Sequence, residues 1–136
     1  MNRAAQILVV DDHPITRKTT CSLLQAEPDF EVVCDATNGV DAVVQAKHLQ
    51  PDVVILDINM PGMNGLEAAR HIKNAAPFAE IVFLSQHTEL ETIRQAFHVG
   101  GRAYVLKSDA GKELVPAVHA VRAKSRYLND RFSARI

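Results

Sequence analysis

The stretch VVILDINMPGMNGLEA (residues 53–68) contains a strand-like segment followed by a helical one. Its first four residues are all apolar, which is typical of a parallel strand that helices cover on both faces. Asp57 directly follows this strand, and Leu66, Ala69 and Ile72 then recur at helical spacing. A narrow apolar stripe of this kind lets a helix pack one face on a sheet. The stretch therefore predicts a βα unit of an α/β fold.

The same alternation of strand-like and helical segments continues on both sides of this unit. Strands one, three and four are apolar throughout, so we expect them at the centre of the sheet. The chain therefore predicts a doubly wound α/β domain with five parallel strands and five helices. The predicted strands are Ile7–Val10, Glu31–Cys34, Val53–Leu56, Ile81–Leu84 and Ala103–Leu106.

The composition indicates one domain without a basic surface. A chain of 136 residues has the length of a single domain. With 15 Lys and Arg against 16 Asp and Glu, it lacks the charge excess that nucleic-acid binding needs. Its apolar runs are far shorter than the ~20 residues of a membrane span, and Met1–Gln6 does not resemble a signal peptide. We therefore expect a cytoplasmic protein in which Cys21 and Cys34 are free, buried thiols.

Polar side chains stand directly after four of the strands. Asp11 and Asp12 follow the first, Asp57 the third, Ser85 the fourth and Lys107 the fifth. The carboxyl ends of parallel strands meet at one edge of a sheet, where ligands bind. Two carboxylates about 4 Å apart repel by about 4 kcal/mol at an effective dielectric of ~20, so positive charge is needed there. A lysine supplies one charge, and oxygen ligands suit a hard divalent ion, Mg²⁺ or alternatively Mn²⁺.

Each of these residues also has a simpler interpretation when it is taken alone. Asp11 or Asp12 would cap the helix that Pro14 opens, Asp57 would be a solvated loop residue, and Lys107 would be a surface lysine. The joint placement of all of them at one edge of the sheet favours a site. The six histidines show no ligand spacing, so we expect them to be solvated or capping, except His87 near the mouth of the site.

Two features near the C-terminus depart from a regular pattern. Pro116 lies inside the fifth helical segment, so this helix either starts near Lys112 or kinks. Residues 125–136 lose the β pattern, and we expect them to fray after the fifth helix.

Four motifs carry a resemblance to a known family: LVVDDHP (residues 8–14), VVILDINMPGMNGLEA (53–68), FLSQH (83–87) and AYVLKSDA (103–110). Together they resemble the receiver domain of two-component response regulators, and most of all the NarL/FixJ (LuxR-type) subfamily. The resemblance implies a flavodoxin-like sheet of strand order 2-1-3-4-5. It also implies a receiver domain over residues 5–128. Residues 129–136 would be a C-terminal tail or the start of a linker to a helix-turn-helix effector domain outside this chain.

The resemblance also implies a role for each candidate site residue. Asp57 would accept a phosphoryl group. The residues that would hold Mg²⁺ are Asp11, Asp12, Asp57 and Asn59, the last through its backbone carbonyl. The residues that would bind the phosphoryl group or respond to it are Lys107, Ser85 and Tyr104. The side chains of Asn59 and His87 are candidate modulators of the site.

The implied function is a switch that a sensor histidine kinase phosphorylates and that repacks the surface around the fourth helix, fifth strand and fifth helix. It would control self-association or an effector, and would reach DNA only through an effector domain. Its chemistry would be limited to self-phosphorylation and autodephosphorylation.

Three other functions fit this fold less well. A flavin-binding electron carrier needs a phosphate loop after strand one, where Asp11 and Asp12 would repel phosphate. An aspartate-nucleophile phosphatase needs a DxDx(T/V) motif, whereas these two aspartates are adjacent. A pseudo-receiver, which binds partners without phosphorylation, usually lacks the acceptor, the acidic pair or the lysine.

Overall fold

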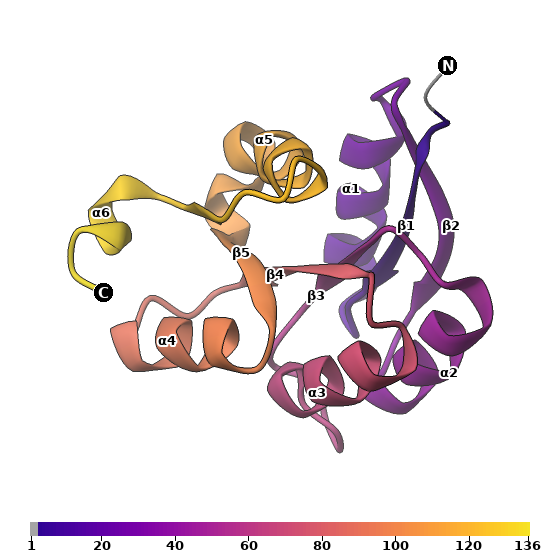
Figure 1. Cartoon of the computed structure of the whole chain (residues 1–136), viewed down its shortest axis with the longest axis horizontal. Helices are drawn as coiled ribbons and strands as arrows, with labels where there is room; N and C mark the ends of the chain where they lie inside the picture. Colours follow the sequence, from indigo (N-terminus) through magenta and orange to yellow (C-terminus); the bar gives the residue numbers. More distant parts are fainter. Residues whose placement is uncertain (1–2) are drawn as a thin grey trace.

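The computed structural model describes residues 3–136 and contains a parallel sheet between two layers of helices (Figure 1). The strands are β1 (Ala5–Val10), β2 (Phe30–Ala36), β3 (Val53–Leu56), β4 (Glu80–Ser85), β5 (Gly101–Leu106) and β6 (Tyr127–Leu128). The helices are α1 (Pro14–Gln25), α2 (Gly39–Leu49), α3 (Gly65–Ala75), α4 (Leu90–His98), α5 (Ala110–Arg122) and α6 (Asp130–Ser133), with the short 3₁₀ helix η1 (Lys107–Asp109) before α5. Within residues 3–136, no helix is long and apolar enough to cross a membrane.

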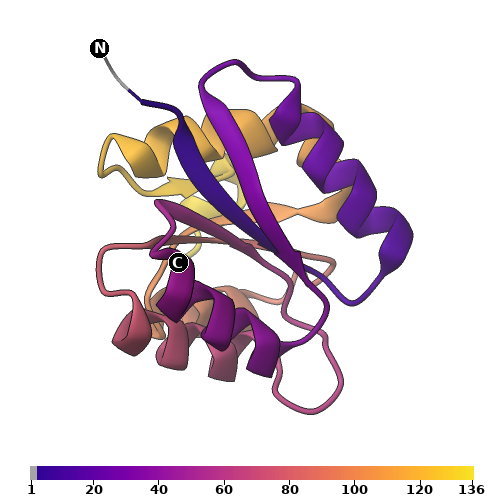
Figure 2. The ribbon, with the colours of Figure 1, turned by 90° about the vertical axis from the view of Figure 1, so that its right-hand side faces the viewer.

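The strands follow the order β2-β1-β3-β4-β5-β6, and every neighbouring pair is parallel. The flavodoxin-like order predicted for the first five strands is confirmed, and β6 extends the sheet at the β5 edge. Helices α1 and α5 cover one face, while α2, α3 and α4 cover the other (Figure 2). Residues 3–136 thus form six strands and six α-helices, one more of each than predicted.

The core lies on both faces of the central strands. Every residue of β3 and β4 is buried, and so are five of the six in β1, which confirms the expected central positions. Leu56 and Phe83 contribute to the core under α2, α3 and α4, whereas Ile55 and Leu84 contribute to the core under α1 and α5. Strands packed on both faces form a rigid support for the loops that follow them.

The register of the sheet places the residues after β1 and β3 side by side. Val10 pairs with Leu56, and Leu56 pairs with Phe83. Asp11 and Asp57 are the next residues of their strands, and the Asp57 N–H donates to the Val10 carbonyl at 3.0 Å. The site at this edge is therefore set by backbone pairing.

The expectation that the C-terminal residues fray is wrong for most of this segment. Leu128 in β6 pairs with Tyr104 in β5. Phe132 in α6 is buried beside α4, and Asn129 Nδ2 donates to Glu113 at 2.7 Å. A strand of two residues has no detectable periodicity, so sequence patterning could not predict it.

One further expectation needs correction, and the start of α5 lies close to the predicted one. Cys21 and Cys34 are free but partly exposed, because they line a groove between α1 and the edge strand β2. Helix α5 begins at Ala110, before Lys112, and continues through Pro116 to Arg122.

Candidate functional site

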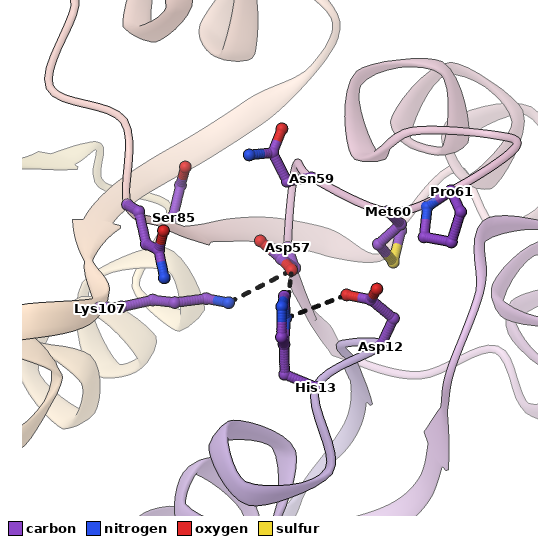
Figure 3. A pocket seen from close by; sticks show the side chains of 9 residues that line it. Asp12, His13, Asp57, Asn59, Met60, Pro61, Ser85 and Lys107 are labelled. Carbon is purple, nitrogen blue, oxygen red and sulfur yellow. Dashed lines mark ion pairs between the residues drawn. The ribbon is translucent and has the colours of Figure 1, made fainter.

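A pocket of about 410 Å³ lies at the carboxyl ends of β1, β3, β4 and β5 (Figure 3). The sheet brings together the acidic, hydroxyl and basic side chains that follow these strands. The residues that line the pocket are Asp12, His13, Asp57, Asn59, Met60, Pro61, Ser85, Gln86 and Lys107.

Lysine and aspartate side chains form a buried ion-pair cluster in this pocket. Lys107 Nζ lies 3.2 Å from Asp57 Oδ2 and 3.2 Å from Asp11 Oδ2. The two carboxylates are each 4% exposed and the lysine side chain is 11% exposed, so water screens these charges poorly. Lys107 therefore offsets part of the repulsion between the two acids.

The Asp57 carboxyl is the titratable group most affected by this arrangement. Burial raises the pKa of Asp57, the charge of Lys107 lowers it, and the charge of Asp11 raises it again, which leaves it at about 6. The pKa remains below 7, so the side chain is mainly ionised at neutral pH. Any further cation in the pocket would favour this ionised form.

Three buried carboxylate oxygens in the pocket accept no well-formed hydrogen bond within residues 3–136. Of these, Asp11 Oδ2 and Asp57 Oδ2 share the Lys107 ammonium, and Asp12 Oδ1 lies 3.1 Å from His13 Nδ1. One lysine does not neutralise three carboxylates, and buried charge of this kind is costly unless a further cation or water satisfies it. The aspartates and His13 also offer ligand atoms that all lie within 4.8 Å of one another. This donor set fits a divalent cation.

The loop after Asp57 is held in place by the start of α3. The Gly65 N–H donates to the Ile58 carbonyl at 2.8 Å. A Cβ atom at Gly65 would collide with the carbonyl oxygen of Asp57, so this close approach requires glycine. Asn64 caps α3 by accepting a hydrogen bond from the Glu67 N–H at 3.0 Å. These contacts fix the backbone on which Asp57 stands.

Ser85 and Tyr104 are connected through the backbone of His87. The His87 N–H donates to Ser85 Oγ at 3.1 Å, and the Tyr104 hydroxyl donates to the His87 carbonyl at 2.8 Å. Tyr104 is 1% exposed, so its ring already lies inward. We expected the His87 ring near the mouth of the pocket, but His87 is not among the residues that line it. Its Nδ1 lies 3.6 Å from Glu89 Oε2 instead. His87 therefore contributes through its main chain.

His13 is a charged-site residue that sequence reasoning missed. It is the N-cap residue of α1, as the expectation of a capping histidine allows, but its side chain makes no capping hydrogen bond there. Its Nδ1 instead lies 3.1 Å from Asp12 Oδ1 and 3.2 Å from Asp11 Oδ1. Figure 3 shows the imidazole ring of His13 and the side chain of Lys107 pointing towards Asp57. The only available signal was its position directly after the two aspartates.

Gln86, Met60 and Pro61 also line the pocket, although they were not predicted as site residues. Each follows a predicted site residue within four positions, so their placement is a consequence of the loops after β3 and β4.

The arrangement suits attack by a carboxylate on an electrophile that carries negative charge. Asp57 is ionised near neutral pH and needs no general base to act as a nucleophile. Lys107 and a cation would neutralise charge on the incoming group, which is the main requirement of phosphoryl transfer.

Comparison with known proteins gives a family match over most of the chain. The model of the response regulator receiver domain matches residues 7–119. The transcriptional regulatory protein DegU of Brevibacillus brevis is 35% identical over 124 residues, which cover 91% of this chain and 52% of that protein. The nitrate/nitrite response regulator protein NarL of Escherichia coli (strain K12) is 36% identical over 126 residues, which cover 93% of this chain and 58% of that protein.

Solved structures agree with these matches. A two-component response regulator of the LuxR family from Aurantimonas sp. SI85-9A1 superposes with a TM-score of 0.91 at 34% identity, over 96% of this chain and 94% of that chain. The signal receiver domain of the putative response regulator NarL from Mycobacterium tuberculosis gives 0.85 at 30% identity, over 90% and 98%. The present chain spans little more than half the length of the two curated relatives described above.

Proposed function

Because this chain belongs to the family of response regulator receiver domains, we propose that Asp57 accepts a phosphoryl group from a sensor histidine kinase and thereby switches the domain. The observation that carries this proposal is the buried Asp57 carboxylate, which shares the single Lys107 ammonium with Asp11 at 3.2 Å and lies beside the third carboxylate, Asp12. Such a cluster is costly for folding, and phosphoryl transfer explains why it is kept.

The transfer forms a bond between an Asp57 carboxylate oxygen and phosphorus as the bond from phosphorus to the kinase histidine nitrogen breaks. The electron pair of the broken bond stays on the imidazole, which then takes a proton from water. Lys107 Nζ is close enough to Asp57 to pair with the phosphoryl oxygens once they are in place. Ser85, at the end of β4, would donate a hydrogen bond to the same group.

The clustered carboxylate oxygens of Asp11, Asp12 and Asp57 fit a divalent cation, and we assign them, with the Asn59 backbone carbonyl, as its ligands. When bound, Mg²⁺ would supply positive charge that offsets the phosphoryl oxygens. The hard oxygen donors favour Mg²⁺, with Mn²⁺ as the alternative.

The response would pass through Ser85, His87 and Tyr104. A Ser85 hydroxyl drawn towards the phosphoryl group would change its contact with the His87 N–H. Because the Tyr104 hydroxyl donates a hydrogen bond to the His87 carbonyl, this change would reach Tyr104. The surface around α4, β5 and α5 would repack and alter self-association or an effector. By analogy with the transcriptional regulatory protein DegU, we assign the switch to transcription regulation through a DNA-binding domain, and residues 129–136 to a C-terminal tail or the start of a linker.

Mass spectrometry after incubation with Mg²⁺ and a small acyl phosphate tests this function. Wild type should gain one phosphoryl group, and Asp57→Asn should gain none. The matched control is Asp35→Asn, because Asp35 is exposed and pairs with Arg17 outside the pocket. Uptake by Asp57→Asn would exclude Asp57 as the acceptor. No uptake by wild type with acyl phosphate and phosphoramidate donors would exclude this function and favour a pseudo-receiver.

Asn59 lines the pocket two residues after Asp57, close to the expected path of water towards the phosphoryl group. We expect Asn59→Met to change the dephosphorylation rate, because it replaces a polar amide with an apolar side chain. Decay of the phosphorylated form, followed by mass, measures this rate. A rate equal to that of wild type would remove Asn59 as a modulator.

A further inference from the structure

The imidazole of His13 reaches the acidic pocket, and the proposed function gives it no role. His13 Nδ1 lies 3.1 Å from Asp12 Oδ1 and 3.9 Å from Asp57 Oδ2. We propose that His13 is a nitrogen ligand of the cation in this pocket, and that it shifts the preference of the site from Mg²⁺ towards first-row transition ions. This inference rests on the cation site of the proposed function.

The distances match those between ligands of one metal ion. With bonds of about 2.1 Å, neighbouring ligands of an octahedral ion lie about 3.0 Å apart and opposite ligands about 4.2 Å apart. The separations from His13 Nδ1 to the carboxylate oxygens of Asp11, Asp12 and Asp57 run from 3.1 to 3.9 Å. One ion can therefore contact the imidazole and the carboxylates with only small side-chain adjustments.

Two independent features support a cation at this point. Asp11 Oδ2 and Asp57 Oδ2 belong to side chains that are 4% exposed, and they share one ammonium group, that of Lys107, at 3.2 Å, which leaves negative charge in the pocket uncompensated. The position of His13 is also fixed locally. The backbone N–H of His13 donates to Asp11 Oδ1 at 2.9 Å, and α1 begins at the next residue, Pro14. These contacts fix the backbone of His13 beside the cluster, while its side chain is 54% exposed.

The nitrogen donor determines which ions gain from this contact. Mg²⁺ prefers oxygen ligands and water, whereas imidazole suits the later first-row ions such as Co²⁺ and Ni²⁺. His13 should therefore strengthen Co²⁺ binding much more than Mg²⁺ binding. A histidine that only competes with cations for the carboxylates would instead weaken the binding of both.

Calorimetric titration of the whole chain with Co²⁺ and with Mg²⁺ tests the proposal. His13→Ala should lower Co²⁺ affinity by about tenfold or more while changing Mg²⁺ affinity much less. The visible absorption of bound Co²⁺ should also change, because a nitrogen ligand is lost. His13→Gln is the second variant, since it keeps a polar side chain, and circular dichroism checks that both fold. His71→Ala, an exposed histidine on α3, is the matched control and should behave as wild type.

An unchanged ratio of Co²⁺ to Mg²⁺ affinity in both His13 variants would overturn the proposal. An equal gain in affinity for both ions would overturn it too, because it would identify His13 as a competitor of the cation. Phosphoryl uptake by wild type separates these results from a failure of the proposed function. If uptake is intact and the ratio is unchanged, only the ligand role of His13 is lost.

Discussion

At the scale of single residues, Asp57 carries a cost that its neighbours only partly offset. Burial raises its pKa more strongly than Lys107 lowers it, and the nearby Asp11 adds to the rise. The ionised form that the chemistry needs is therefore less stable in the folded chain than in the unfolded one. The ionised Asp57 side chain therefore lowers stability in the absence of a cation.

This cost predicts that Asp57→Asn stabilises the protein at pH 7 in the presence of a chelator. A folded pKa of about 6 against an ordinary value of 3.8 means that the penalty is full above pH 6 and absent below pH 3.8. We expect Asp57→Asn to raise the free energy of unfolding by about 1–3 kcal/mol at pH 7. The gain should shrink as the pH falls from about 6 to about 4.

Urea unfolding across this pH range, in EDTA, measures the difference. Glu91→Gln is a suitable control because the Glu91 side chain is 73% exposed. A gain that stays constant with pH, or a loss of stability at pH 7, would contradict the origin of the effect in Asp57 ionisation.

The sequence was sufficient to predict the carboxylates and Lys107 because each directly follows a strand of one parallel sheet. It was not sufficient for His13, since the residue type and spacing did not distinguish a histidine that turns into the pocket from one that faces solvent. The direction of the ring depends on the Asp11 contact to its backbone and on the start of α1 at Pro14. Local three-dimensional geometry, rather than a motif, decides its place.

At the scale of elements, α5 contains a proline that its own stability does not require. Pro116 lies in the interior of the helix and is exposed, so it removes a backbone hydrogen bond without burying much apolar surface. An alanine there could donate to the carbonyl four residues earlier. We expect Pro116→Ala to raise the free energy of unfolding by about 1–3 kcal/mol.

Denaturant unfolding checks this prediction, with Pro77→Ala as a control of opposite sign. Pro77 lies between α3 and β4, where losing proline increases the freedom of the unfolded chain and should cost up to about 1 kcal/mol. A loss of stability in Pro116→Ala would show that the proline is needed for the packing of α5.

The β6–α6 segment is an element that depends on a small number of contacts. Besides the pairing of β6 with β5, Arg131 Nη2 lies 2.9 Å from Asp109 Oδ2, and Phe132 is buried beside α4. Patterning could predict the five longer strands, whose apolar runs are distinct, but this segment is folded by tertiary contacts. Its contacts are few enough for it to open separately from the sheet.

We therefore expect Phe132→Ala to release the segment without unfolding the domain. Hydrogen exchange should become fast at residues 127–133 and stay slow in β1 and β3, which lie at the centre of the sheet. Phe78→Ala is the control, since Phe78 is 88% exposed and packs little. A drop of about 3–5 kcal/mol in global stability with no local opening would mean that α6 belongs to the cooperative core.

At the scale of the whole molecule, the sheet connects the pocket to the C-terminal segment by short routes. Tyr104, which is bonded to the His87 carbonyl, also pairs with Leu128 of β6. Lys107 begins η1, and Asp109 ends it and holds Arg131 of α6. A shift of Lys107 towards a phosphoryl group would therefore act on the residues that hold α6 in place.

These routes predict that phosphorylation of Asp57 loosens β6 and α6. Lys107 would leave Asp11 for the phosphoryl oxygens, η1 would move with it, and the ion pair between Asp109 and Arg131 would weaken. With a coupling free energy of about 1 kcal/mol, hydrogen exchange at residues 127–133 should become about fivefold faster. Exchange in β1 and β3 should change little, because their contacts lie in the core.

Hydrogen exchange with and without an acyl phosphate, in Mg²⁺, measures this effect, with mass confirming the phosphoryl group. Asp57→Asn treated in the same way should show no change. Arg131→Ala should exchange quickly in both states, since the ion pair that phosphorylation would weaken is already absent. If residues 127–133 stayed fully protected in the phosphorylated chain, the prediction would be wrong. The response to phosphorylation would then be confined to α4 and α5, and the segment would only extend the sheet at β5.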